Sequence, residues 1–256
     1  MAVLKDELGI KYIKLSKWTK FIQFIEDKKE AYQYIWRGQS NNKWDLVSSF
    51  GRLFEDDYPK KDIEREAKKH LDRFKYIAKG FIDYDELCLN NDDEMWALAQ
   101  HYGLATPLLD WTYSPFVALF FAIHNHFLDE NIMISIWGLG NLQNCNKIAK
   151  EKNIDTINRF HPKQRKNSRL ISQNGLFTKI PFGYSLNKWI NECTYSNDLI
   201  NLFKVDIEFN SNNEIKNCLI FLNRMNINYY TLFPDAEGVT KFCNMSFWID
   251  KYHRFW

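Results

Sequence analysis

Paired cysteines, long apolar runs and an excess of charge of one sign are all missing from this sequence. Its five cysteines are odd in number and form no CxxC pair, which argues against a zinc site or a disulfide framework. We therefore expect packing thiols in a reducing compartment, and no metal ion. Because Lys5, Asp6 and Glu7 stand where a signal peptide would be apolar, and no apolar run approaches the roughly 20 residues of a membrane helix, we expect a cytoplasmic protein without a membrane partner.

The charge balance excludes a general attraction to polyanions. Lys and Arg total 34 against 32 Asp and Glu, so nucleic acid or anionic lipid would need a local basic patch. The chain has 256 residues, of which 45% are hydrophobic, which is enough for a large buried core. We expect a single domain over residues 1–256.

Hydrophobic periodicity predicts several helices and strands. An amphipathic helix over 16–27, capped by Ser16, is expected to open the chain, and a short aromatic strand over 32–36 places Arg37 at its end. The same reasoning predicts helices over 62–78, 93–102, 114–123 and 215–225, and strands over 131–137 and 203–209. The polar stretch 141–169 is expected to be a surface excursion or a flap, and the aromatic tail 247–256 to pack on the body.

The first polar signal is Trp36-Arg37-Gly38-Gln39. An arginine that leaves an apolar strand beside a glycine is suited to grip a phosphate or carboxylate with two parallel hydrogen bonds. The alternative is a structural arginine that pairs with an internal acid such as Asp110, and the sequence leaves both readings open.

The second polar signal is the run from Gln100 to Thr112, which lies between a helix end and a buried helix start. Its hydrogen-bonding groups need partners if they are buried. His101 by itself is more typical of a satisfied core histidine than of a catalyst. Asp110 and Thr112 have the alternative role of capping the helix that begins at Ser114.

These two segments resemble the signatures of the FRG domain. Trp36-Arg37-Gly38 resembles the Phe-Arg-Gly signature, with tryptophan in the first position. The second signature is matched by His101-Tyr102-Gly103, Thr106, Leu108-Leu109-Asp110-Trp111-Thr112, Ser114-Pro115 and 118–122. Further resemblance lies in 48–52, 168–178 and 232–238, so about residues 30–240 are covered. Pro107 stands where many relatives have a basic residue.

A weaker resemblance links the chain to ADP-ribosyltransferases that place an arginine at the end of a first core strand. Residues 36–38 resemble that element, and 110–114 followed by 118–122 resemble the later strand and helix. The resemblance implies an α+β fold with a mixed or antiparallel sheet core and flanking helices. It also implies NAD as substrate, a protein or nucleic acid as acceptor, and a bacterial toxin or phage-defence effector with an antitoxin or regulatory partner.

The resemblance assigns site residues within this chain. The residues implied for catalysis are Arg37, His101, Asp110, Gln173 and Glu237. The residues implied for NAD binding are Arg37, Gly38, Gln39, Ser49, Arg52, Tyr102, Thr106, Trp111, Thr112 and Phe177. Glutamine cannot act as a base, so Gln173 cannot replace a catalytic acid. Either Asp235 or Glu237 enters the site from another element as that acid, or the site has no catalytic acid and both are turn residues.

Two other function classes remain open. The first is a nucleotide- or phosphate-binding module with the same architecture but no chemistry. The second is a nucleic-acid-binding effector that uses Arg37, Arg52, Arg169 and an aromatic such as Trp44. A metal site at His124 and His126 is disfavoured, because two residues apart on a helix they point to nearly opposite sides.

Overall fold

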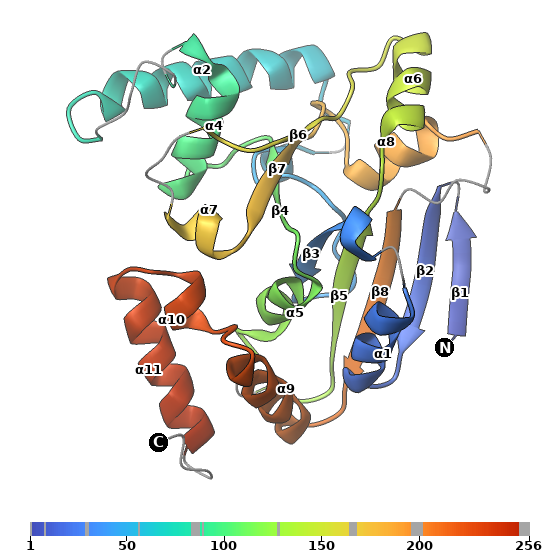
Figure 1. The fold of residues 1–256 in the computed structure, drawn as a ribbon. Coiled ribbons are helices and arrows are strands. Elements are labelled where there is room, and N and C mark those ends of the chain that lie inside the picture. The colour runs from blue at the N-terminus through green and yellow to red at the C-terminus, as the bar shows by residue number, and fades with distance from the viewer. Residues whose placement is uncertain are drawn as a thin grey trace.

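The computed structural model describes residues 2–7, 9–28, 31–55, 57–82, 88, 90–126, 129–163, 168–195 and 202–250. The strands are β1 Ala2–Glu7, β2 Ile10–Leu15, β3 Ile35–Gln39, β4 Leu108–Thr112, β5 Ile132–Leu139, β6 Arg159–Phe160, β7 Gly175–Lys179 and β8 Leu202–Phe209 (Figure 1). The helices are α1 Thr19–Asp27, α2 Lys60–Ala78, α4 Asp92–His101, α5 Pro115–Ile123, α6 Gln143–Glu151, α7 Ser168–Ser172, α8 Leu186–Glu192, α9 Asn212–Arg224, α10 Tyr229–Leu232 and α11 Ala236–Asp250.

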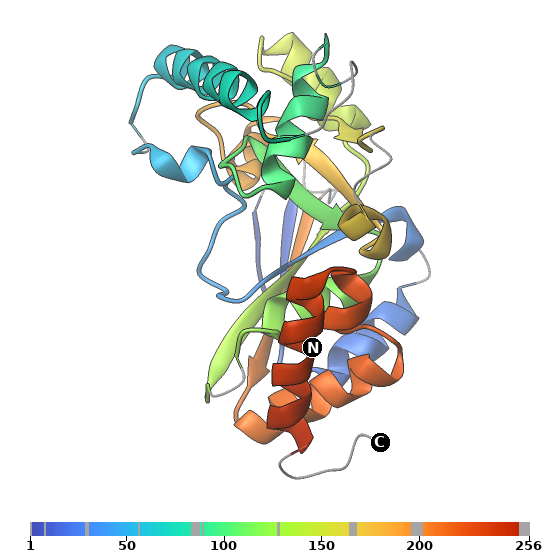
Figure 2. The ribbon, with the colours of Figure 1, turned by 90° about the vertical axis from the view of Figure 1, so that its left-hand side faces the viewer.

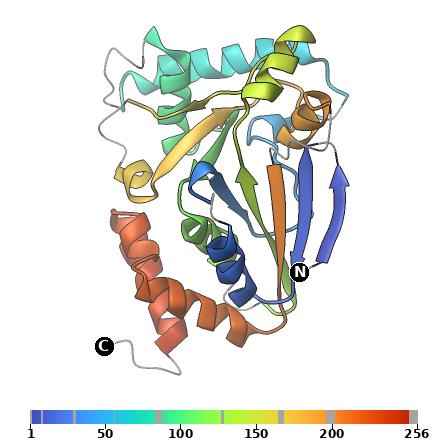
Figure 3. The same ribbon diagram turned by 45° about the vertical axis from the view of Figure 1, so that its right-hand side comes forward.

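The eight strands of the described residues form one mixed sheet, in the order β1-β2-β8-β5-β3-β4-β7-β6. Strands β2 and β8 pair in parallel, and the other neighbours are antiparallel. Figure 3 shows the sheet running from the blue strands β1 and β2 at one edge toward the yellow β7. The predicted α+β fold with a mixed sheet and flanking helices is confirmed at this level.

Alternate side chains of the central strands enter two separate cores, as the period of two in a strand requires. Trp36 and Ile136 pack in one core with helices α1, α5 and α9. Their neighbours Ile35 and Trp137 pack on the opposite face with α6 and α8. The sheet is therefore covered on both faces along β3 and β5.

Helix α5 is the central helix of the first core. The Ser114 hydroxyl accepts a hydrogen bond from the Val117 amide, and Pro115 occupies the first turn, which is a favourable helix start. Leu119 and five other residues of this nine-residue helix are buried. The predicted buried helix is confirmed, and it runs along β3 (Figure 1).

Helices α2 and α4 form a third cluster at the far end of the sheet. Ile63 and Leu71 of α2 pack with Met95 and Trp96 of α4. Both helices were predicted, and α4 ends at His101, one residue before the predicted end. Figure 2 shows this end opposite to α10 and α11, which are drawn in red.

Three predictions about local structure are wrong. The β1–β2 hairpin precedes α1, which we expected to be the first element. Trp18 is the N-cap of α1, so Ser16 does not have that role. Sequence patterns missed β2 because its other neighbour in the sheet, β8, is remote in sequence. Strand β3 begins at Ile35, because 31–33 form a separate 3-10 turn, and Arg37 lies in its middle. The stretch 141–169 contains helix α6, which buries Cys145 and Ala149 against the sheet.

The predicted aromatic tail falls partly within helix α11, which extends to Asp250, while 251–256 lie outside the described residues. Among the helices that are described, none has the length and apolarity to cross a membrane.

Candidate functional site

A cavity of 860 Å³ opens beside the middle of β3. Its wall is built by β3 and β4, by the ends of α4 and α5, by α7, and by the loop that follows β3. The lining residues with ionisable side chains are Arg37, Lys43, Asp45, Arg52, His101, Asp110, His124 and Arg169. Segments on both sides of the chain's midpoint therefore meet at one site.

Arg37 reaches from β3 to the neighbouring strand β4. Its Nη1 donates to the carbonyl oxygen of Asp110 at 2.8 Å and lies 3.4 Å from the Asp110 carboxylate. The arrangement is a loose ion pair, since the Asp110 side chain is 60% exposed. The Arg37 Nε is buried and has no hydrogen-bond partner.

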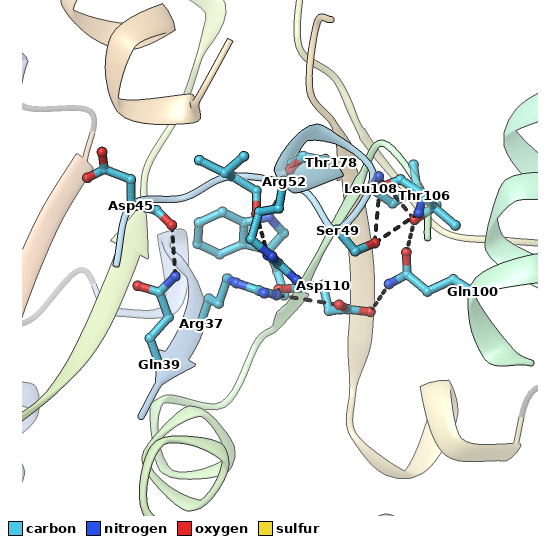
Figure 4. A network of polar contacts seen from close by, with 12 residues as sticks. Arg37, Gln39, Asp45, Ser49, Arg52, Gln100, Thr106, Leu108, Asp110 and Thr178 are labelled. Atoms are coloured by element: carbon cyan, nitrogen blue, oxygen red, sulfur yellow. Dashed lines mark hydrogen bonds and ion pairs between the residues drawn. The ribbon is translucent and has the colours of Figure 1, made fainter. Parts of the chain in front are cut away.

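Arg52 lies beside Arg37 (Figure 4). Its Nη1 donates to the Val47 carbonyl at 2.8 Å, which is a neutral acceptor. Burial lowers the pKa of the Arg37 guanidinium, Asp110 raises it, and the positive charge of Arg52 lowers it again. We call Arg37 and Arg52 the arginine pair. Among the described residues, the exposed carboxylate of Asp110 is the only acid bonded to this pair.

A chain of hydrogen bonds joins Asp110 to Gln100, Thr106 and Ser49 (Figure 4). The Thr106 hydroxyl donates to the Gln100 side-chain oxygen, and Gln100 donates from its amide nitrogen to the Asp110 carboxylate. The Thr106 amide donates to the Ser49 hydroxyl at 2.9 Å, and Ser49 donates back to the Thr106 carbonyl. This chain fixes the Asp110 carboxylate relative to Arg37.

Phe121, His124, Arg169 and Phe233 form another part of the lining, which we call the ring wall. Burial lowers the pKa of His124 to about 4, with smaller effects from Lys241 and His126, so the imidazole is neutral at pH 7. Its Nδ1 lies 2.6 Å from the Tyr229 hydroxyl. His101 also lines the cavity, and burial lowers its pKa, followed by the charge of Arg169.

The cavity brings together most of the residues that the sequence suggested. Those in the lining are Arg37, Gly38, Gln39, Arg52, His101, Asp110, Trp111, Thr112, Gln173 and Phe177. The Thr112 hydroxyl donates to the Gln173 carbonyl and accepts from the Ser114 amide, so it ties β4 to the residue that caps α5. The capping side chain is that of Ser114, whereas the Asp110 carboxylate bonds Arg37 and Gln100. Ser49 and Thr106 lie behind the lining and support it.

Several of these residues have structural partners. The Trp111 indole is buried and donates to the Thr178 hydroxyl at 2.9 Å. Gln39 accepts from the Trp137 indole and donates to the Asp45 carbonyl. Neither side chain is available to cover a ligand ring.

Tyr102 and Glu237 are not in the lining. Tyr102 is 56% exposed at the end of α4, because the chain turns there at Gly103 with φ +88°. Glu237 lies 2.7 Å from Arg169 and 2.7 Å from Lys241. Its carboxylate is bound by Lys241 and by the lining residue Arg169, so the role that fits its position is to hold Arg169.

Sequence reasoning missed Lys43, Phe121, Asn125 and Phe233 as lining residues. Phe121 lies in an apolar helix and carries no signal that separates a lining residue from a core residue. Phe233 precedes the Pro234 turn, and only its distance from Arg169 reveals its place. Lys43 follows β3 by four positions in a polar loop.

No group of metal-binding side chains occurs among the residues that the structure describes. His126 contacts the Asp129 carboxylate and the Ser40 carbonyl, whereas His124 contacts Tyr229. The two histidines have separate partners.

Comparison with known proteins gives one match. Residues 32–131 match the family model described as FRG domain. No curated protein and no solved structure matches the chain. The matched region contains the arginine pair and the segment from Gln100 to Thr112, whereas Arg169, Gln173 and Phe233 lie outside it.

Proposed function

We propose, from the match of residues 32–131 to the FRG domain model and from the geometry of the cavity, that this cavity binds a nucleotide through the phosphates, with NAD as the ligand. The observation that carries the proposal is the arginine pair. Two neighbouring guanidinium groups repel each other, and here the described structure supplies only one loosely bound carboxylate and neutral carbonyls to offset that repulsion. A phosphate group would offset it by charge-assisted hydrogen bonds to both side chains.

The rest of the cavity supports a ligand larger than a free phosphate. Its volume of 860 Å³ lies in the range of about 300–1,000 Å³ typical of small-molecule sites. The ring wall adds an apolar surface of the kind that accepts a base. A nucleotide combines these two features in one molecule.

ADP-ribosyl transfer is the second and finer proposal, favoured by the position of Asp110. The strand pairing of Trp36 with Thr112 places Asp110 next to Arg37, as in the resemblance to ADP-ribosyltransferases. In that reaction the ribose–nicotinamide bond breaks, its electron pair leaves with nicotinamide, and a carboxylate stabilises the oxocarbenium-like ribose. A protein or nucleic-acid nucleophile then bonds to the ribose carbon, and its proton passes to the solvent. Asp110 is the carboxylate we assign to this step.

Binding is tested with the full chain by titration calorimetry, using NAD and inorganic pyrophosphate. We expect both to bind the wild type, and Arg37→Ala and Arg52→Ala each to weaken both by about tenfold or more, since a charge-assisted hydrogen bond contributes about 1.5–3 kcal/mol. Arg73→Ala, on the exposed side of α2 and outside the lining, is the matched control. Absence of binding to either ligand by folded wild type would refute the proposal.

Turnover is tested by following nicotinamide release from adenine-labelled NAD, with and without RNA, DNA and cell extract. Release and labelling that are lost in Asp110→Asn would support ADP-ribosyl transfer. Binding without release would leave a nucleotide-binding module. Salt-dependent binding of RNA or DNA, without NAD binding, would favour the nucleic-acid effector.

A further inference from the structure

The ring wall is a continuous surface of planar groups. The centroids of Phe121 and Phe233 are 5.9 Å apart, and Phe121 lies 5.9 Å from the His124 ring. The guanidinium carbon of Arg169 lies 5.2 Å from the Phe233 centroid. Four side chains from three separate segments thus present rings or a planar guanidinium to one side of the cavity.

Arg169 differs from the arginine pair in its charge partners. Its Nε lies 2.6 Å from the Asp235 carboxylate, and its Nη2 lies 2.7 Å from the Glu237 carboxylate. Lys241 completes the cluster through Glu237 at 2.7 Å, so two cations face two anions. A guanidinium neutralised in this way attracts a phosphate weakly, but it keeps its planar face and the hydrogens on Nη1.

The segment that holds Arg169 is closely packed. The Gly238 amide donates to the Asp235 carboxylate at 3.0 Å. A Cβ at Gly238 would lie 1.8 Å from the Phe233 carbonyl oxygen, so the first turn of α11 packs directly against the Phe233 backbone. The Asp235 carboxylate is therefore held close to Phe233, and together with Glu237 it orients the Arg169 guanidinium.

The rest of the ring wall is also uncharged. The His124 imidazole, with its low pKa and its contact to Tyr229, adds no positive charge at pH 7. Phe121 and Phe233 are apolar. The cavity therefore has a cationic part at the arginine pair and an electrically balanced, planar part at the ring wall.

We infer that the ring wall holds the uncharged base of the ligand, with Arg169 as the specificity-determining residue that stacks on it, while the arginine pair holds the phosphates. This inference rests on the proposed function. For NAD it assigns the adenine to the ring wall, because the nicotinamide ring is cationic and would gain nothing from a neighbouring guanidinium. The family match ends at residue 131, so two of the four ring-wall residues, Arg169 and Phe233, lie outside the matched region.

The test uses the full chain and three probes: inorganic pyrophosphate, ADP-ribose and NAD. Arg169→Lys keeps the positive charge but removes the plane, and Phe121→Leu removes a ring without touching the salt bridges. We expect each variant to lower the affinity for ADP-ribose and NAD by about tenfold, the scale of one stacking contact. Pyrophosphate binding should be unchanged, since it has no base. Thermal melting verifies that each variant is folded.

Three results would overturn the inference while leaving the proposed function standing. An equal loss of pyrophosphate binding in Arg169→Lys would make Arg169 a phosphate contact. A loss for NAD alone would place nicotinamide at the wall. Unchanged affinity for all three probes in folded Phe121→Leu and Arg169→Lys would remove the ring wall from the site. Failure of the wild type to bind any probe would instead refute the proposed function itself.

Discussion

The backbone of Gly38 lies directly against the carbonyl of Ala118. A Cβ at position 38 would lie 1.9 Å from that oxygen and 2.8 Å from the Ala122 amide nitrogen. The glycine therefore permits α5 to approach β3 closely, and α5 carries Phe121 and His124 to the cavity. Its role in the Trp-Arg-Gly signature is packing of the helix, which in turn shapes the site.

Gly38→Ala is predicted to destabilise the fold. A methyl group at this position collides with helix backbone, and overpacking of this kind costs about 3 kcal/mol. Urea unfolding followed by circular dichroism measures the loss. Gly80→Ala is the control, since no atom lies within 4 Å of its added Cβ, and it should change stability by less than about 1 kcal/mol. Equal stability of the two variants would contradict the packing role.

Trp111→Phe is predicted to lower stability without weakening NAD binding. The change leaves the buried Thr178 hydroxyl without the indole donor, a loss of about 1–3 kcal/mol. Chemical denaturation and calorimetric titration of the same sample measure the two effects. A large loss of affinity in a protein of unchanged stability would return Trp111 to the role of a ligand contact.

Leu119→Asp is predicted to prevent folding. Leu119 is fully buried in α5, and an unpaired carboxylate at such a position costs more than about 4 kcal/mol. Ile171→Asp makes the same type of change at a side chain that is 73% exposed and should remain folded. Soluble expression and thermal melting compare the two. A normally melting Leu119→Asp protein would show that α5 tolerates charge.

Stability is predicted to fall as the pH is lowered from about 6.5 to about 4. Burial depresses the folded-state pKa of His124 from 6.5 to about 4, so over this range the unfolded chain binds a proton that the folded chain does not. The contribution is fully present above pH 6.5 and is lost toward pH 4, with a total of up to about 3 kcal/mol.

Urea unfolding at several pH values, repeated with His124→Asn, isolates this contribution. The variant should show a flatter dependence between pH 6.5 and 4. The pKa values of Asp235 and Glu237 are also lowered, first by hydrogen bonds from Arg169 and Lys241 respectively, and because both carboxylates are present in wild type and variant alike, their contribution cancels in the comparison. Identical slopes in wild type and variant over pH 6.5–4 would exclude His124 as the source.

Local sequence patterns predicted the elements that depend on local interactions. Ser114 and Pro115 marked the start of α5 because capping and proline geometry act within one turn. The alternation around Val205 marked β8 for the same reason. Strand β2 and helix α6 were missed, since their pairing and docking depend on residues far away in the chain.

The same distinction between local and distant interactions separates the site residues that the sequence predicted from those that it could not assign. Arg37 and the segment from Gln100 to Thr112 were found because their residue types are unusual beside buried elements, and the structure brings them together through the pairing of β3 with β4. Glu237 illustrates the limit, since the sequence shows an acid beside a glycine but not that Arg169 and Lys241 bind it.

The sequence by itself determined where the buried helix α5 begins, that a sheet is flanked by helices, and that Arg37 and Asp110 were candidates to meet. These properties follow from periodicity, capping and side-chain chemistry, which act over a few residues. The tertiary structure alone decided that Arg52 lies beside Arg37 and that Phe233 contacts both Phe121 and Arg169. Such contacts join residues distant in the chain, and only the packing of the sheet and helices fixes the distances between them.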